Sequence, residues 1–278
     1  MNTPPTGTPS TPRHRRRLLK WGLSAVVVVL VAAGAFIWWF FRDDAPDAVS
    51  IGDAVAQVES ADTVAAEVTP TVVSSTAATE ANAAAPISGA AESGVTGTWS
   101  VDTSIGEFSY EDSTGTFVGF RVEEELTGIG STTAVGRTPE VTGTLVIAGT
   151  TVSDVTIEAD MTAITTNEGR RDDKVQSALG TDEFPAATFV LTEPIELGTA
   201  VESGESVSVP ATGELTIHGV TTPVTIPLDA QVVGENIVVV GSLDVVFADY
   251  GVNVPSAPVV VSAEDEGVIE LQLFFSQA

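Results

Sequence analysis

Cysteine is absent from the 278 residues of this chain, and only two histidines are present, His14 and His218. The lack of cysteine excludes a disulfide framework, a thiolate nucleophile, a cysteine-ligated zinc and a lipid-modified cysteine anchor. A protein metal centre needs three or four ligands, and a nucleophile needs a base with an orienting partner. We therefore expect no metal site, no cofactor and no enzyme activity.

Basic residues are also few, with 11 Lys and Arg against 38 Asp and Glu. Six of the bases lie in the first 42 residues, which contain no acid, whereas the other five bases share the rest of the chain with all 38 acids. So acidic a body excludes nucleic-acid binding, because phosphate contacts need clustered Lys and Arg. It is also repelled by anionic lipid headgroups.

One long apolar run follows the basic tail of residues 1–20. Trp21 to Phe41 read WGLSAVVVVLVAAGAFIWWFF and carry no charge. As a helix this run would extend roughly 31 Å, at about 1.5 Å per residue, which is enough to cross the hydrocarbon core of a membrane. The positive-inside rule then leaves the basic tail in the cytoplasm and the acidic body outside the cytoplasmic membrane.

The alternative for this run is a secretory signal peptide, because Ala33-Gly34-Ala35 resembles a cleavage site. Cleavage there would leave FIWWFF as an apolar start on the secreted protein, and the run is longer than a usual signal core. We therefore predict a single-pass membrane anchor over residues 21–41, with secretion after cleavage as the alternative.

Residues 42–97 have the composition of a disordered acidic linker. They are rich in Ala, Val, Thr, Ser and Glu, contain no Phe, Trp or Tyr, and show no persistent period. Such a segment buries too little apolar surface to offset the entropy of ordering, and a chain of this length has an r.m.s. span of roughly 45 Å. A short helix around Ala54 to Val68 is only weakly indicated.

Residues 98–278 are rich in Val, Ile, Thr and Phe in alternating runs bounded by Gly, Pro, Asp and Asn. This pattern is typical of antiparallel strands with one apolar face and one wet face. The expected strands lie near residues 98–103, 117–127, 131–137, 140–148, 151–162, 187–197, 206–219, 221–233, 236–249 and 267–276. The polar stretch Thr165 to Ala178 predicts a single helix, with Thr166 or Asn167 as its N-cap. The region is therefore mainly β, either one closed barrel or a sandwich.

Six motifs of this region resemble, in the same order, those of the YceI-like family of polyisoprenoid-binding, lipocalin-like bacterial barrels. They are Trp99-Ser-Val-Asp102, Phe117-Val-Gly-Phe-Arg-Val122, Arg171-Asp172 after Thr165-Thr166, Asp182-Glu-Phe-Pro-Ala-Ala-Thr-Phe189, Gly213-Glu-Leu-Thr-Ile-His-Gly-Val-Thr-Thr-Pro-Val224 and Asp249-Tyr-Gly-Val252. The family often has a pair of histidines near its first strands, where this chain reads Thr103-Ser104. No role that rests on those histidines is carried over.

The resemblance implies an extended antiparallel β-barrel of about eight strands with a short flanking helix. It also implies non-enzymatic binding of a long-chain isoprenoid or other apolar lipid, as a carrier, buffer or store. The residues expected to line the cavity are Phe120, Val122, Leu145, Ile157, Phe189, Leu191, Leu215, Ile217, Phe247 and Leu271. Sequence does not separate a hollow barrel from a filled one, so the alternative is a stress-related or cell-surface interaction module without a lipid ligand.

Two charged or polar features carry alternative interpretations. Arg171 is a possible contact for a polar or phosphorylated headgroup, or else a structural ion-pair partner. His218 is expected to face outward where the hairpin of residues 213–228 turns, with Gly219 supplying the turn conformation. Scattered carboxylates, including Glu123, Glu124 and Glu125, support a hydrolase only by their abundance, because adjacent strand residues point to opposite faces.

Overall fold

The computed structural model of the chain describes residues 45–67, 94–126, 130–166, 169–254 and 260–278. The predicted basic tail and membrane span lie outside these ranges. Within them, the helices are all too short or too polar to cross a membrane.

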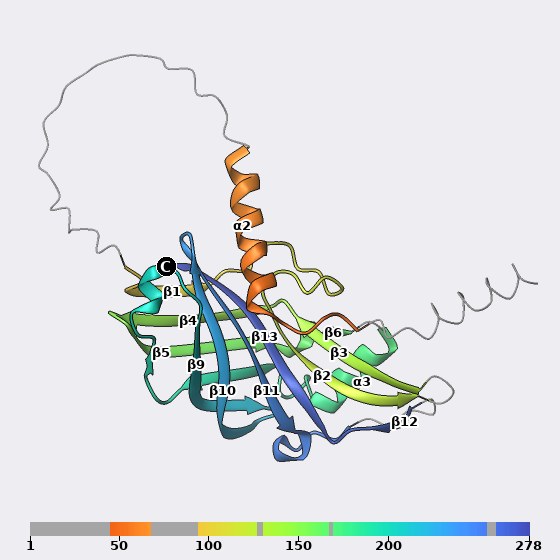
Figure 1. The fold of residues 1–278 in the computed structure, drawn as a ribbon. Coiled ribbons are helices and arrows are strands. Elements are labelled where there is room, and N and C mark those ends of the chain that lie inside the picture. The colour runs from red at the N-terminus through yellow and green to blue at the C-terminus, as the bar shows by residue number, and fades with distance from the viewer. Residues whose placement is uncertain (1–44, 68–93, 127–129, 167–168, 255–259) are drawn as a thin grey trace, which may run out of the picture. The chain divides into compact units, whose positions relative to one another are not determined.

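The strands of the described residues form one antiparallel sheet (Figure 1). Its strands are β1 (Gly97–Val101), β2 (Phe117–Leu126), β3 (Gly130–Thr138), β4 (Val141–Ala148), β5 (Thr151–Asp160), β6 (Thr165–Thr166), β7 (Ala186–Leu191), β8 (Ile195–Glu196), β9 (Val207–Ile217), β10 (Val220–Val233), β11 (Asn236–Val246), β12 (Val260–Ala263) and β13 (Glu266–Gln277). The helices are α2 (Ile51–Glu67) and α3 (Gly169–Leu179), with short 3-10 turns η1 (Met161–Ala163), η2 (Ala200–Ser203) and η3 (Phe247–Tyr250).

Eight of these strands close a barrel in the order β1-β4-β5-β7-β9-β10-β11-β13, and β13 pairs back to β1. The closing ladder is short, running from Trp99 opposite Gln277 to Val101 opposite Phe275. The Trp99 side chain is 5% exposed and its indole N–H donates to Val95 O at 2.9 Å, which fixes the start of β1 in the core. The prediction of a mainly β, closed antiparallel barrel of about eight strands is confirmed.

The first half of β13 pairs instead with β2, from Val268 opposite Arg121 to Gln272 opposite Phe117. Strand β2 also pairs with β3, and β3 pairs with the two-residue strand β6. These strands therefore extend the wall at one end of the barrel. Helix α3 lies beside this extension (Figure 1). It begins at Gly169 rather than Thr165, because Thr165 and Thr166 pair with β3.

The start of α3 is held by Asp172, whose carboxylate accepts from the backbone N–H and the hydroxyl of Thr166, both at 2.7 Å. The other predicted cap, Asn167, lies outside the described residues.

Two predicted strands end early. The run expected over residues 187–197 is divided into β7 and β8 at Pro194, which lacks the N–H that a continuous ladder requires. The run expected over 236–249 stops at Val246, where η3 turns the chain.

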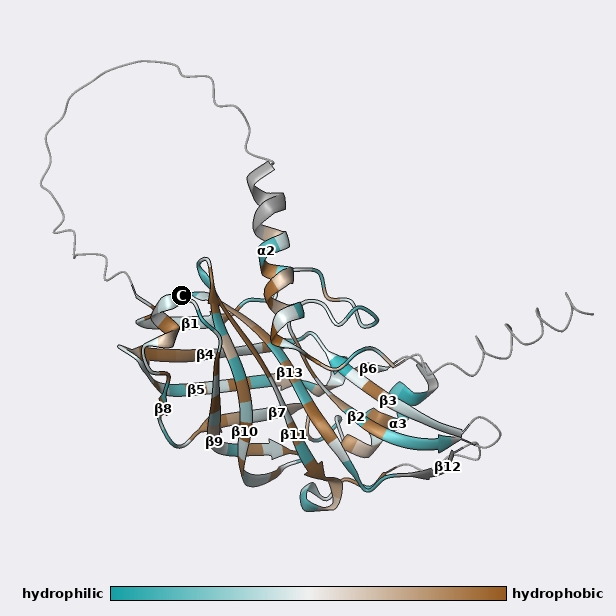
Figure 2. Cartoon of the chain, in the orientation of Figure 1, coloured by the Kyte–Doolittle hydropathy of each residue, from teal (hydrophilic) through white to brown (hydrophobic). Residues whose placement is uncertain are grey.

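The inner faces of the strands form the main apolar core. On β13, Ile269, Leu271, Leu273 and Phe275 alternate toward the barrel interior as predicted. The outer face of the same strand was predicted to be wet, and this is wrong: Glu270 and Gln272 are 1% exposed and Phe274 is fully buried. Figure 2 shows apolar and polar residues interleaved along such strands.

The cover on this outer face is a segment that we call the strap, residues 45–61, which includes the first turns of α2. Ala54 and Val58 are fully buried against Val238, Val240 and Phe274. The strap belongs to the same compact unit as the barrel, residues 44–278. The expectation of a disordered linker over residues 42–97 is therefore wrong for residues 45–67, because the small apolar stripe of α2 finds a complementary wall only in the folded barrel.

Candidate ligand-binding cavity

The barrel interior contains an apolar space that we call the inner chamber. It is lined by residues of the eight closed strands and their connections, among them Leu145, Ile157 and Leu273. All of its lining residues are apolar except Thr188 and Gln231. Its volume is about 140 Å³, close to that of apolar cavities that admit a benzene-sized molecule, so it suits a slender chain.

A second space, the helix-side chamber, lies where α3 covers the end of the barrel. Its volume is about 160 Å³. Helix α3 presents Arg171, Val175, Ala178 and Leu179 to it, a spacing that places side chains on one helical face. Unlike the inner chamber, it is lined by ionisable side chains: Glu124, Arg171 and Tyr250.

The two chambers adjoin. Val118, Ala187, Leu215 and Ile269 line both of them. The result is a pair of adjoining, mainly apolar spaces of which only one is lined by ionisable groups, and this matches the polarity of an amphiphile with a slender tail.

Nine of the ten residues predicted to line a cavity lie on one chamber or the other. Leu145, Ile157, Phe189 and Leu271 line the inner chamber; Phe120, Val122, Ile217 and Phe247 line the helix-side chamber; Leu215 lines both. Leu191 lines neither and instead packs half-buried against the main core. Alternation along the strands therefore brings together all but one of the predicted set.

Arg171 reaches the helix-side chamber, but it does so already paired. Its Nη2 donates to Glu124 Oε2 at 3.0 Å, and the two side chains are 21% and 14% exposed. Glu124 shares the inner face of β2 with Phe120 and Val122. Its neighbour Glu123 is exposed and accepts from Thr133 Oγ1 at 2.9 Å. Alternation along β2 thus admits one acid of the Glu123–Glu125 triplet to the chamber.

Tyr250 closes another part of this chamber. Its side chain is 3% exposed, and its hydroxyl has no hydrogen bond of normal geometry within the described structure. Burial raises the pKa of Tyr250, the nearby Thr222 side chain lowers it in part, and the charge of Asp249 raises it further. The phenol is therefore neutral at physiological pH and available as a donor.

His218 occupies the turn between β9 and β10, as predicted. It and Gly219 have φ values of 51° and 72°, the left-handed pair that a two-residue hairpin turn requires. The expected outward orientation is wrong, because the half-buried ring packs edge-on against Phe184 at 5.0 Å between centroids. Its Nδ1 also lies 3.2 Å from Tyr250 O. His218 thus fixes η3 and the loop before β7 around the chamber.

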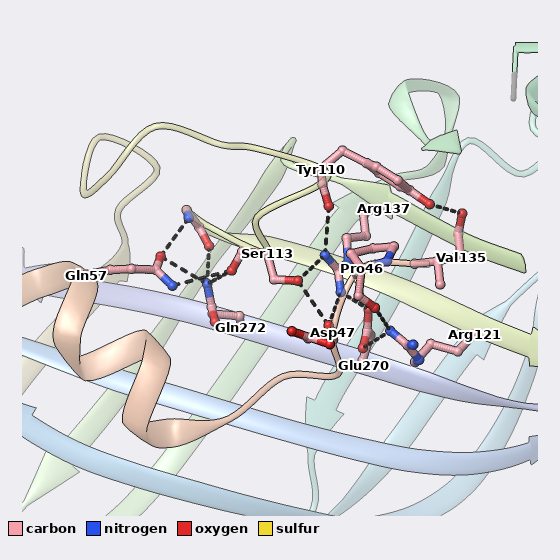
Figure 3. A network of polar contacts seen from close by, with 11 residues as sticks. Pro46, Asp47, Gln57, Tyr110, Ser113, Arg121, Val135, Arg137, Glu270 and Gln272 are labelled. Atoms are coloured by element: carbon pink, nitrogen blue, oxygen red, sulfur yellow. Dashed lines mark hydrogen bonds and ion pairs between the residues drawn. The ribbon is translucent and has the colours of Figure 1, made fainter. Parts of the chain in front are cut away.

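A second charged cluster, which sequence reasoning missed, lies beneath the strap (Figure 3). Arg137 is fully buried, and its Nε and Nη2 donate to Glu270 Oε1 at 2.8 and 2.6 Å. Arg137 Nη2 also donates to the backbone oxygen of Asp47 at 3.0 Å. Arg121 Nη1 donates to Pro46 O at 2.7 Å and lies 3.7 Å from Glu270 Oε2.

The same cluster continues along the strap through glutamines. The backbone N–H of Gly115 donates to Gln57 Oε1 at 3.0 Å, and Gln272 Nε2 donates to Gly115 O at 2.8 Å. The one available sequence signal was the rarity of bases: Arg121 and Arg137 are two of only five in the acidic body.

A family model and several known proteins are similar to this chain. The family model of the YceI-like domain matches residues 110–275. Protein YceI of Shigella flexneri and that of Escherichia coli O157:H7 are each 35% identical over 83 residues, 29% of this chain and 38% of theirs. The match thus spans well under half the length of these curated relatives.

Among solved structures, a polyisoprenoid binding domain from Saccharophagus degradans, implicated in plant cell wall breakdown, is similar with 18% identity. That similarity covers 65% of this chain and 98% of the other, with a TM-score of 0.48. BcnA of Burkholderia cenocepacia is 17% identical over 63% of this chain and 98% of its own, with a TM-score of 0.47.

Proposed function

The chain belongs to the YceI-like domain family, and on that premise we propose that its barrel binds an isoprenoid or similar apolar lipid without catalysis. The observation that carries the proposal is the pair of adjoining chambers: the inner one is lined by apolar residues except Thr188 and Gln231, and the helix-side one is also lined by ionisable groups. The tail would occupy the inner chamber and the head would lie between Glu124, Arg171 and Tyr250.

The energetics favour a carrier, buffer or store. Burial of about 500 Å² of tail stabilises the complex by roughly 12 kcal/mol at about 25 cal/mol per Å², before the costs of association. The same tail is equally at ease in a bilayer, so its transfer between membrane and barrel is near balance. Exchange in both directions follows from that balance.

We propose binding rather than hydrolysis because of the carboxylate arrangement. Only Glu124 of the β2 triplet lines the helix-side chamber, and it is paired with Arg171. Glycosidase-type chemistry needs two carboxylates facing one bond, and Glu124 has no such companion among the described residues that line the chamber.

We also propose that the protein acts at the outer side of the cytoplasmic membrane. The support is the uncharged run from Trp21 to Phe41 behind a basic tail. Protease accessibility of the C-terminal region on intact spheroplasts tests this topology, and a protected C-terminal region contradicts it.

Native mass spectrometry of the full chain in mild detergent tests the binding function. We expect a co-purified prenyl lipid, and we expect Leu215→Trp to abolish it, because Leu215 lines both chambers. Glu214→Gln is the matched control, an exposed neighbour on the opposite face of β9. A barrel that carries no lipid and excludes an apolar fluorescent dye would contradict the proposal and support a filled interaction module.

A further inference from the structure

We propose that the helix-side chamber selects lipids with an uncharged, hydrogen-bonding head and rejects phosphorylated ones, and that Glu124 makes this distinction. The inference rests on the proposed lipid-binding function and adds the chemical class of the head, a hydroxyl or carbonyl. It narrows the expected role of Arg171 from a polar or phosphorylated head to an uncharged polar one.

The first step is the state of Arg171. Its guanidinium is bound to Glu124 at 3.0 Å, and both side chains are largely shielded from water. The pair is close to neutral as a unit, so a ligand anion meets an arginine whose charge is already compensated. Binding a phosphate there requires either expelling Glu124 or placing two anions side by side in an apolar space.

The second step is the placement of the other bases. Arg121 and Arg137 lie on the outer face of the wall and are committed to Glu270 and the strap. Lys174 is exposed and is not part of the chamber lining, so Arg171 is the one cation among the described side chains that line it. A phosphate monoester carries about −1.5 to −2 charges at neutral pH, and the described side chains that line the chamber supply no second cation to offset them.

The third step is what the chamber offers to a neutral head. A guanidinium carries five N–H donors and a carboxylate is an acceptor, so the pair satisfies a hydroxyl that both accepts and donates. Tyr250 adds a buried hydroxyl without a hydrogen-bond partner of normal geometry in the described structure. A prenyl alcohol or quinone-like carbonyl therefore finds partners without a charge being buried.

The test uses the full chain in mild detergent, with two matched probes, geranylgeraniol and geranylgeranyl monophosphate. Each probe competes with an apolar fluorescent dye for the cavity at pH 7.5. We expect the alcohol to bind wild type at least 10-fold more tightly than the monophosphate. In Glu124→Gln the monophosphate should gain at least 10-fold, while the alcohol changes less than 3-fold.

Two further variants assign the effect. Glu123→Gln makes the same charge change on the opposite face of β2 and should leave both affinities unchanged. Glu124→Gln combined with Arg171→Gln should lose the gain for the monophosphate, because the arginine that paired with Glu124 is gone. If Glu124→Gln does not fold, Ala178→Lys adds a cation to the chamber face of α3 and should produce the same gain.

The possible outcomes distinguish a failure of the headgroup selection from a failure of the proposed lipid binding. Monophosphate binding to wild type as tightly as the alcohol, or an unchanged preference in Glu124→Gln, overturns the headgroup selection and leaves lipid binding intact. Failure of both probes to displace the dye, or failure of the dye to enter, removes the proposed function itself.

Discussion

Two arginine–glutamate pairs lie on opposite faces of the same wall, and strand β2 contributes Glu124 to the inner pair and places Arg121 beside the outer one. On the outer face Arg137 and Glu270 are 0% and 1% exposed and are joined by two hydrogen bonds. On the inner face Arg171 and Glu124 share one hydrogen bond and remain 21% and 14% exposed. Arg121 and Glu124, three positions apart on β2, point to opposite sides of the wall and so serve different pairs.

This difference in exposure and in hydrogen bonding indicates a different role for each pair. The outer pair is shielded from water, and the remaining donors of Arg137 go to the backbone oxygens of Asp47 and Tyr110 and to the hydroxyl oxygen of Ser113. Such a pair fixes one arrangement of the chain, and losing one partner leaves a buried charge. The inner pair lines the helix-side chamber, where we propose that its charges meet the head of a ligand. The outer pair should therefore govern folding and the inner pair should govern selection.

The largest effect is expected for Arg137→Met. It leaves Glu270 buried without its main partner and should lower the free energy of unfolding by about 3–5 kcal/mol, measured by urea denaturation with Trp fluorescence. Pairing it with Glu270→Gln should recover part of the loss, because the buried charge is then gone. A loss below 1 kcal/mol for Arg137→Met would show that the outer pair is not structural.

Undocking the strap should have the next effect. Val58→Asp places a charge at a fully buried position of α2 against Val240 and Phe274, and should cost about 2–4 kcal/mol. We expect faster hydrogen exchange over residues 51–61. Ala56→Asp adds the same charge at an exposed position of the same helix and should change the stability by less than 0.5 kcal/mol. Equal effects from the two variants would mean that the strap contributes nothing to the fold.

Glu124→Gln should change stability far less than Arg137→Met, by about 1 kcal/mol or less, because the inner pair is partly solvated. Its signature should be altered ligand preference at nearly constant midpoint of denaturation. If it destabilises the barrel as strongly as Arg137→Met, the two pairs are equivalent and the contrast between the faces disappears.

The smallest expected effect is on the way stability depends on pH in the acid range. Although burial raises the pKa of Asp102, its hydrogen bonds from the Ser104 hydroxyl and backbone N–H, with a further one from Ser276, lower it below its usual 3.8. The folded state therefore holds this proton less tightly than the unfolded chain. Stability from Asp102 is present above that ordinary pKa and is lost as the pH falls through the depressed one.

Asp102→Asn should therefore flatten the acid limb of the stability curve measured by thermal melts between pH 5 and pH 2. Glu123→Gln, an exposed acid on β2, is the control. An unchanged slope below pH 4 would remove Asp102 from the acid response.

The sequence predicted most of the strands because alternation is a local signal, whereas the choice of a barrel over a sandwich came from the family resemblance. The inward residues of β13 and the turn at His218 and Gly219 follow from period and turn chemistry alone. The strap could not be read the same way, since the stripe of Ala54 and Val58 is short and its partner wall exists only after folding. Arg137 and Glu270 are 133 residues apart, so their pairing depends on strand order and register.

The residues of the cavity also differ in how far the sequence predicts them. Nine lining residues follow from alternation, whereas the pairing of Glu124 with Arg171 joins a strand to a helix 47 residues away. The sequence marked Arg171 as a cation and left its partner open, and the headgroup selection that we propose depends on that partner.

The strap also determines how the barrel is held mechanically. The ring closes through a ladder of three residue pairs between β1 and β13, which is shorter than the other ladders of the ring. A force on the chain ahead of Ala45 arrives first at Pro46 and Asp47, whose oxygens are held by Arg121 and Arg137 on the long strands β2 and β3. The two arginines thus transmit a pulling force on this segment to strands β2 and β3 before the force reaches the ladder between β1 and β13.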